Sequence, residues 1–218
     1  IDAFVFSSTC AVYGVPKTEQ LDETHSIAPL SPYAHSKAQV EITLTRAASE
    51  GLRSASLRYF NAAGADISGE IGEAHEPETH LLPLAVDAML GVGPPLTLLG
   101  HDYPTPDGSC VRDFIHVSDL ADAHVRALRW LQRAPANGLH EQFNVGSGSG
   151  HSVRQVVAET ARIAGRPVPH TVGPRRPGDS PRLVGNIEKS QRELEWLPKR
   201  DLDIQIEDTL RWRRKMPR

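Results

Sequence analysis

The sequence has 218 residues, of which 39% are hydrophobic and 23% are charged, and its formal net charge is −3. This balance is typical of a folded chain with a sizeable core, and the mild acidity gives no reason to expect a nucleic acid partner. No apolar run approaches the roughly 20 residues that cross a bilayer, so we expect no membrane partner. Cys10 and Cys110 match no metal or redox spacing, which favours reduced thiols in a cytoplasmic protein.

The first predicted element is a short strand. Residues 3–6 are apolar and run directly into Ser7 and Ser8, as a buried parallel strand does when it ends in a polar loop. Only two residues precede it, although a central strand needs neighbours on both sides. We therefore expect an upstream part of the fold to lie outside this sequence.

A helix is predicted to begin after Ser31, a good N-cap residue, with Pro32 at its first position. Tyr33 then lies in the first turn, where unpaired N–H groups and the helix dipole favour a phenolate. Lys37 follows one turn later on the same face, so its charge is expected to lower the pKa of the phenol. The apolar positions 40, 44 and 47 continue this face toward the core. Taken alone, Tyr-x-x-x-Lys also fits a solvated pair, and the context must decide between the two.

The next strand is predicted at residues 54–60, with Gly51 ending the helix before it. Strand, helix and strand in this order predict a right-handed crossover in a doubly wound, Rossmann-like parallel α/β sheet. Ligands of such sheets bind beyond the carboxyl ends of the strands. Thr9, Asn61 and the start of the Tyr33 helix are expected to meet at that edge.

The remaining residues are expected to form a smaller mixed α/β domain on the substrate side. Residues 62–111 leave the sheet, and a helix capped by Ser118 and running through Leu131 returns to it, followed by a strand near 142–145. Helices near 152–165 and 203–215 complete the substrate side.

Several motifs occur in a fixed order along most of the chain. They are SSTCAVYG at 7–14, the Tyr33 and Lys37 pair, LRYFNAAGA at 57–65, DYPT with DG at 102–108, VRDFIHV at 111–117 and PRRPGD at 174–179. Several are weak individually, but together they are specific. The chain resembles the UDP-glucose 4-epimerases, which are extended short-chain dehydrogenases/reductases.

The resemblance implies NAD as cofactor and the catalytic residues Tyr33, Lys37 and Thr9. Tyr33 is implied to take the proton of the sugar 4-hydroxyl while hydride passes from C4 to NAD. Lys37 is implied to hold the nicotinamide ribose and Thr9 the 4-oxygen, and Phe60 lies against the nicotinamide. Hydride leaves the sugar carbon only if the hydroxyl proton leaves as well, so the reaction needs a base. A phenol of ordinary pKa near 10 is a poor base at pH 7, and a nearby cation is what would lower that pKa.

The resemblance also implies a site for the rest of the UDP-sugar. Asn61 donates to the diphosphate, Arg112 and Arg176 contact phosphate, and Asp179 contacts the ribose. The uracil end is held largely through backbone, by His80, Leu81, Thr97, Leu98 and Leu99. Arg175, by contrast, is expected to form a surface ion pair. Leu183 stands where the family has a gate residue that helps to decide whether an N-acetylated sugar enters.

By the resemblance, residues 1–61 form the second half of the NAD-binding Rossmann-like domain, and the first half is expected to be missing. Residues 62–218 mainly form the UDP-sugar-binding domain, with 112–145 returning to the sheet. The chain alone is therefore expected to be inactive, and a homodimer through the Tyr33 helix is implied for the full-length protein.

Other functions stay open at this point. UDP-N-acetylglucosamine or UDP-pentose 4-epimerases share nearly all of the motifs, and a catalytically dead binding fragment is a further possibility. A sugar-nucleotide 4,6-dehydratase needs an acid and a base beside the threonine, and Thr9-Cys10-Ala11 offers neither.

Two further patterns are interpreted as structural. Residues 146–150 follow G-x-G-x-G, not the dinucleotide spacing G-x-G-x-x-G, and we predict a tight loop there. The ten histidines show no metal-ligand spacing, so we predict no metal site.

Overall fold

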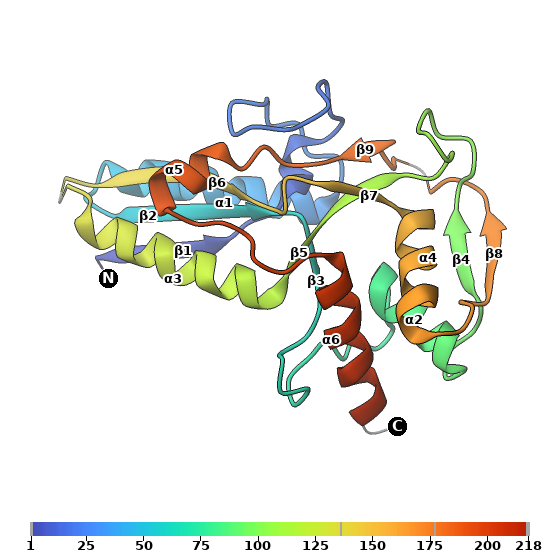
Figure 1. The fold of residues 1–218 in the computed structure, drawn as a ribbon. Coiled ribbons are helices and arrows are strands. Elements are labelled where there is room, and N and C mark those ends of the chain that lie inside the picture. Colours follow the sequence, from blue (N-terminus) through green and yellow to red (C-terminus); the bar gives the residue numbers. More distant parts are fainter. Residues whose placement is uncertain (1, 136, 177, 217–218) are drawn as a thin grey trace.

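Residues 2–135, 137–176 and 178–216 are described by a computed structural model, a mixed α/β fold with a Rossmann-like parallel sheet (Figure 1). The elements in chain order are β1 (Ala3–Ser7), η1 (Cys10–Tyr13), α1 (Pro32–Ala48), β2 (Arg53–Tyr59), β3 (Asn61–Ala63), α2 (Leu81–Leu90), β4 (Leu96–Leu99), β5 (Val111–His116), α3 (Val117–Arg133), β6 (Leu139–Val145), β7 (Gly150–Ser152), α4 (Val153–Ala164), β8 (His170–Gly173), β9 (Arg182–Leu183), α5 (Glu188–Leu194) and α6 (Leu202–Lys215). None of these helices is long and apolar enough to cross a membrane.

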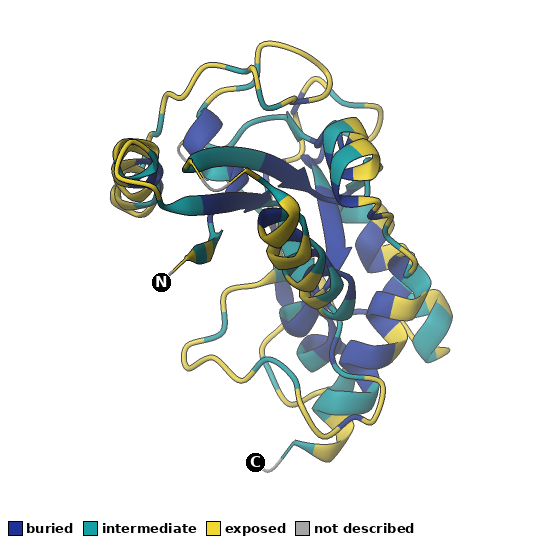
Figure 2. Ribbon diagram, turned by 90° about the vertical axis from the view of Figure 1, so that its left-hand side faces the viewer, coloured by how far each residue is buried: buried dark blue, intermediate teal, exposed yellow. Residues whose placement is uncertain are grey.

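The first lobe is the sheet β1-β2-β6, in which both pairs of strands are parallel. Ala55 and Leu57 of β2 are fully buried and pack with α3, β6 and the residues around α5. Ser54, Ser56 and Arg58 alternate with them and face α1, because successive side chains of a strand point to opposite faces. Figure 2 shows that burial runs through the strands and the inward sides of the helices.

The second lobe contains β3, β5, β7 and β9, the parallel pair β4-β8, and the helices α2, α4 and α6. The three helices pack against one another and against β4, with Val86, Leu98 and Leu210 in the shared core. Strand β3 follows β2 after one residue, so the chain passes from the sheet into this lobe at Phe60 (Figure 1).

Local sequence signals place several helix ends correctly. The Ser31 hydroxyl accepts a hydrogen bond from the Ala34 amide at 3.2 Å, and Pro32 is the first residue of α1. Ser152 and Gln155 form a capping box at α4, which ends in a left-handed Gly165.

The predicted Ser118 cap is wrong, because the His116 imidazole accepts a hydrogen bond from the Ser118 amide and α3 begins at Val117.

The buried face of α1 also differs from the predicted one. Its buried residues are Ala34, Ala38, Glu41 and Leu44, whereas Val40 is 36% exposed. Glu41 forms a buried ion pair with Arg58 of β2, which holds this face of α1 against the sheet. The spacing of apolar residues along the helix does not reveal such a polar contact. Gly51 lies three residues beyond the last residue of α1, whose C-cap is Ser49.

Candidate active site

A cavity of about 930 Å³ lies beyond the carboxyl ends of β1 and β2. Its wall contains six of the residues predicted for the site, two of which also line a neighbouring cavity. These are Thr9, Tyr33, Phe60, Asn61, Leu183 and His80. The crossover topology explains the gathering, because parallel strands bring their carboxyl ends to one edge of the sheet.

Thr9 is held rigidly at this edge. It is 8% exposed, and its hydroxyl oxygen accepts a hydrogen bond from the Ala11 amide at 3.2 Å, which caps η1. The neighbouring Cys10 is buried, and burial raises the pKa of its thiol to about 12, so it is a thiol at neutral pH. Thr9 is therefore the polar side chain that this loop offers to the cavity.

Tyr33 is 53% exposed at the cavity wall. Partial burial raises the pKa of its phenol, and the Thr9 side chain offsets this only in part. The Lys37 ammonium lies 5.6 Å from the centre of the Tyr33 ring and donates to the Ser7 carbonyl oxygen at 2.9 Å. The expectation that Lys37 lowers the pKa of Tyr33 is wrong for this geometry. The Lys37 ammonium donates to the Ser7 carbonyl oxygen, and partial burial is the largest influence on the pKa of Tyr33.

A buried polar network, which no sequence pattern revealed, joins the loop after β1 to α1. Arg58 is 4% exposed and donates from its Nε and Nη2 atoms to the Glu41 carboxylate, which is 7% exposed. The Ser8 hydroxyl donates to the same carboxylate at 2.5 Å. Tyr13 accepts from Arg58 and donates to Asn144 at 2.6 Å. The network fixes the residue before Thr9 against the helix that carries Tyr33.

A second cavity of about 310 Å³ adjoins the first and shares Asn61, Ala62 and His80 with it. Most residues predicted to hold the nucleotide line this second cavity. They are Asn61, His80, Leu81, Thr97, Leu99, Arg112, Arg176 and Asp179. Leu98 is the exception, since it is 1% exposed and its side chain packs in the core between α2 and α4. Its neighbours face the cavity because side chains alternate along β4.

The polar residues of the second cavity contact one another. Arg112 donates to the Asp179 carboxylate at 2.9 Å and to the Ser180 carbonyl at 2.8 Å. The Asn61 amide donates to the Asp113 carbonyl at 2.9 Å. Arg175 pairs with Asp102 at 2.6 Å, which confirms the surface ion pair expected for it. Arg176 is exposed at the wall of the cavity.

The glycine-rich loop at 146–150 surrounds a buried carboxylate. The Asp113 side chain accepts hydrogen bonds from the Ser147 amide at 2.7 Å and from the Gly148 amide at 3.2 Å. Burial raises the pKa of Asp113, while these donors act in the opposite direction. The loop amides thus donate to Asp113 of the protein itself, in agreement with the prediction of a structural loop.

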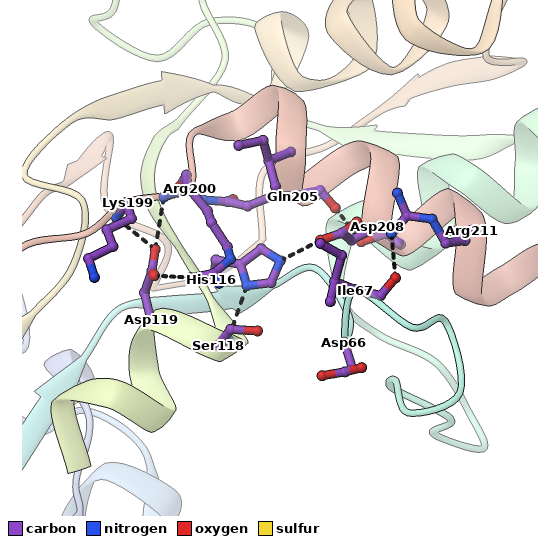
Figure 3. A network of polar contacts seen from close by, with 12 residues as sticks. Asp66, Ile67, His116, Ser118, Asp119, Lys199, Arg200, Gln205, Asp208 and Arg211 are labelled. Atoms are coloured by element: carbon purple, nitrogen blue, oxygen red, sulfur yellow. Dashed lines mark hydrogen bonds and ion pairs between the residues drawn. The ribbon is translucent and has the colours of Figure 1, made fainter. Parts of the chain in front are cut away.

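A network of polar contacts around His116 joins residues of the two lobes (Figure 3). The fully buried His116 contacts the Asp208 carboxylate on α6 at 3.1 Å through Nε2, while its Nδ1 accepts the Ser118 amide at 3.0 Å. Asp119 on α3 accepts from the backbone amides of Lys199 and Arg200. Burial lowers the pKa of His116, so the imidazole is neutral at pH 7.

Known proteins resemble this chain along its length. The UDP-glucose 4-epimerase of Rhizobium leguminosarum bv. trifolii is 48% identical over 216 residues, which are 99% of this chain and 65% of that protein. The chain thus spans less than two thirds of the length of this relative.

Two crystal structures have the same fold. UDP-glucose-4-epimerase from Stenotrophomonas maltophila, with bound NAD and formylated UDP-arabinopyranose, has a TM-score of 0.93 and 37% identity, and the match covers 98% of this chain and 64% of that one. The Brucella ovis enzyme in complex with NAD has a TM-score of 0.90 and 43% identity, covering 96% and 64% of the two chains. Residues 1–146 match the pattern of the NAD dependent epimerase/dehydratase family. The chain therefore belongs to this family.

Proposed function

We propose that the chain carries the catalytic and UDP-sugar residues for NAD-dependent epimerisation at C4 of a UDP-hexose, such as UDP-galactose and UDP-glucose. The observation that carries the proposal is the pair of adjoining cavities. One contains Tyr33 and Thr9, the other contains Arg112 and Arg176, and Asn61 belongs to both walls. A sugar diphosphate that spans them places its sugar beside a phenol and its phosphates beside guanidinium groups.

The first cavity suits proton transfer at a sugar hydroxyl. Tyr33 takes the proton of the 4-hydroxyl, and the Thr9 hydroxyl, fixed at the wall, hydrogen-bonds to the 4-oxygen as its charge changes. The transient 4-keto sugar then turns over and is reduced on its other face. NAD, when bound, supplies the reversible hydride acceptor for C4.

The residues present fit the nicotinamide end of that cofactor. The Phe60 ring belongs to the cavity wall, and the Lys37 ammonium lies 5.6 Å from the Tyr33 ring. Because the pKa of Tyr33 is raised, its phenol is protonated at neutral pH, and proton abstraction requires a cation to approach the phenolic oxygen. Lys37, one helical turn away, supplies that charge once its ammonium leaves the Ser7 carbonyl oxygen that it contacts in this structure.

The second cavity suits a nucleoside diphosphate. Arg112 has a planar, permanently charged fork and one carboxylate partner, Asp179. Phosphate oxygens compete with that carboxylate for the guanidinium and release Asp179 to accept from a ribose hydroxyl. Asn61 and Arg176 supply two further donors at the same wall. The uracil end then lies along the β4 backbone and the start of α2.

The choice of sugar depends on the first cavity. Leu183 belongs to its wall and packs against the core cluster that contains Cys10 and Tyr13. A leucine is intermediate in bulk, so UDP-N-acetylglucosamine and UDP-pentoses are the alternative substrates, and a binding-only role is the alternative function. The predicted homodimer and the predicted inactivity of these 218 residues alone stay predictions.

The test is conversion of UDP-galactose to UDP-glucose by the chain with excess NAD, followed by chromatography of the nucleotide sugars. Tyr33→Phe is the matched variant, because it removes one oxygen at the cavity wall. Conversion that this variant abolishes supports the proposal, and binding of UDP-sugar without conversion supports the alternative, binding-only role. Conversion that survives it, or a chain that binds no UDP-sugar, contradicts the proposal.

The predicted inactivity is tested in the same experiment against the Rhizobium leguminosarum enzyme as reference. A turnover far below that of the reference, with UDP-sugar still bound, supports the inactivity prediction. An equal turnover contradicts it.

A further inference from the structure

Four potential metal ligands converge on one side of the catalytic cavity, within the segment 73–80. Glu73, His75, Glu78 and His80 each offer one ligand atom, and these atoms all lie within 4.8 Å of one another. Three of the four residues, Glu73, His75 and His80, belong to the cavity wall. The spacing of these four residues fits no single zinc motif, so the sequence alone predicts no metal here.

The contacts inside the cluster are close. The Oε1 atom of Glu73 lies 2.7 Å from Nδ1 of His75 and 2.6 Å from Nδ1 of His80. The Oε1 atom of Glu78 lies 3.0 Å from the same His80 nitrogen. Ligand atoms around a tetrahedral zinc ion lie about 3–3.5 Å apart. Small outward movements of these side chains therefore open a coordination site.

Hydrogen bonds to backbone and side-chain atoms hold the cluster in place. The Trp212 indole donates to the Glu73 carbonyl at 2.8 Å. The Thr79 and His80 amides donate to the Glu78 carboxylate at 2.8 and 3.0 Å. His80 is the N-cap residue of α2, yet its side chain makes no capping hydrogen bond and faces the carboxylates instead. The ligands are thus already gathered, which lowers the entropic cost of binding an ion.

One carboxylate oxygen of the cluster is buried without a hydrogen bond among the described residues. The Glu78 side chain is 8% exposed, and its Oε2 atom has no hydrogen-bond partner among the described residues. Arg213 approaches that oxygen only to 3.9 Å and donates to Asp87 instead.

We propose that Glu73, His75, Glu78 and His80 form a site for a divalent transition-metal ion, with Zn²⁺ as the ion that fits best. Two imidazole nitrogens and two carboxylate oxygens are a zinc donor set, and the histidines disfavour Mg²⁺ and Ca²⁺, which take oxygen ligands. The His75 and His80 side chains are 61% and 51% exposed, which gives the ion a route of entry.

The site has a consequence for the cavities beside it. His80 lines both cavities, so an ion that binds its Nδ1 atom fixes the ring at their shared wall. The metal site itself does not depend on the proposed function, and its test uses binding alone.

The experiment is calorimetric titration of ZnCl₂ into the 218-residue chain, prepared without a histidine tag and freed of metal with a chelator. His75→Gln removes one ligand at an exposed position. His101→Gln is the matched control, because His101 is equally an exposed loop histidine but lies outside the cluster. Circular dichroism checks that both variants are folded. Co²⁺ in place of Zn²⁺ reports the coordination geometry by its visible absorption.

We expect one Zn²⁺ per chain, an affinity at least about tenfold lower in His75→Gln, and no change in His101→Gln, since even partners outside the ligand set change metal affinity 10–100-fold. The Co²⁺ spectrum is expected to show histidine ligation that His75→Gln alters. Absence of stoichiometric binding overturns the proposal, and so does a folded His75→Gln chain that binds zinc as tightly as the native chain.

Discussion

The substitution Glu41→Gln tests whether the buried ion pair fixes the helix that carries Tyr33. The Glu41 and Arg58 side chains are 7% and 4% exposed, and Nη2 of Arg58 lies 2.5 Å from the carboxylate. The variant keeps the shape of the side chain but leaves the guanidinium charge buried without a counter-ion. Removing one partner of a buried pair costs about 3–5 kcal/mol. We expect the free energy of unfolding to fall by about 3 kcal/mol, which lowers the melting temperature by about 6–12 °C.

Glu159→Gln is the matched control for this prediction. Glu159 is also a helical glutamate and also lies 2.5 Å from an arginine, but the two side chains are 37% and 57% exposed. Exposed pairs contribute about 0–1 kcal/mol, so we expect a change of less than about 1 kcal/mol. Urea unfolding followed by circular dichroism measures both variants. Equal losses of unfolding free energy in the two variants would show that burial does not decide how much these ion pairs stabilise the fold.

Three further outcomes follow from the structure. Because burial lowers the folded-state pKa of His116, the unfolded chain takes up a proton first as the pH falls. The free energy of unfolding is therefore expected to decrease below about pH 6.5, by up to about 1.4 kcal/mol per pH unit for this group, and urea titrations of His116→Gln should give a shallower slope. In Gly64→Ala, a Cβ atom meets the His116 ring at 2.5 Å on a backbone with φ of +84°. We expect it to lose about 1–3 kcal/mol more than Gly91→Ala, whose φ is +73° and whose new Cβ meets nothing within 4 Å, and equal losses would contradict a clash. Finally, a spectroscopic titration of tyrosinate should give Tyr33, identified by difference from Tyr33→Phe, a pKa above its ordinary value of 10, and a value below 10 would contradict the assigned geometry.

Local signals in the sequence were sufficient for much of the fold and for the composition of the site. Ser31 and Pro32 mark the start of α1 by rules that need only neighbouring residues. The order of strand, helix and strand predicts the parallel pairing of β1 with β2, and with it the edge at which Thr9 and Tyr33 meet. These features follow from short-range chemistry and from the handedness of crossovers.

The exceptions at the predicted ligand-binding residues Lys37, Arg112 and Asp179 involve competition between partners that are distant in the sequence. Lys37 was expected beside the Tyr33 oxygen, but the carbonyl of Ser7 on another strand is the acceptor that it meets. Arg112 and Asp179 were assigned to different parts of a ligand, and they lie close enough to pair with each other. A helical wheel or a motif cannot predict which hydrogen-bond partner such a side chain takes. The partner depends on which groups the fold brings within about 3 Å of each other.

The central claim is that the two adjoining cavities bind one UDP-sugar, and calorimetric titration of UDP-glucose into the native chain and into Arg112→Gln tests it most directly. Arg175→Gln is the matched control, since Arg175 lies in a surface ion pair with Asp102. We expect one UDP-glucose to bind per chain. Binding to Arg112→Gln should be at least about tenfold weaker, because a charge-assisted contact to phosphate contributes about 1.5–3 kcal/mol, and binding to Arg175→Gln should be unchanged. If the native chain binds no UDP-glucose, or if folded Arg112→Gln binds it equally well, the two cavities do not form one UDP-sugar site.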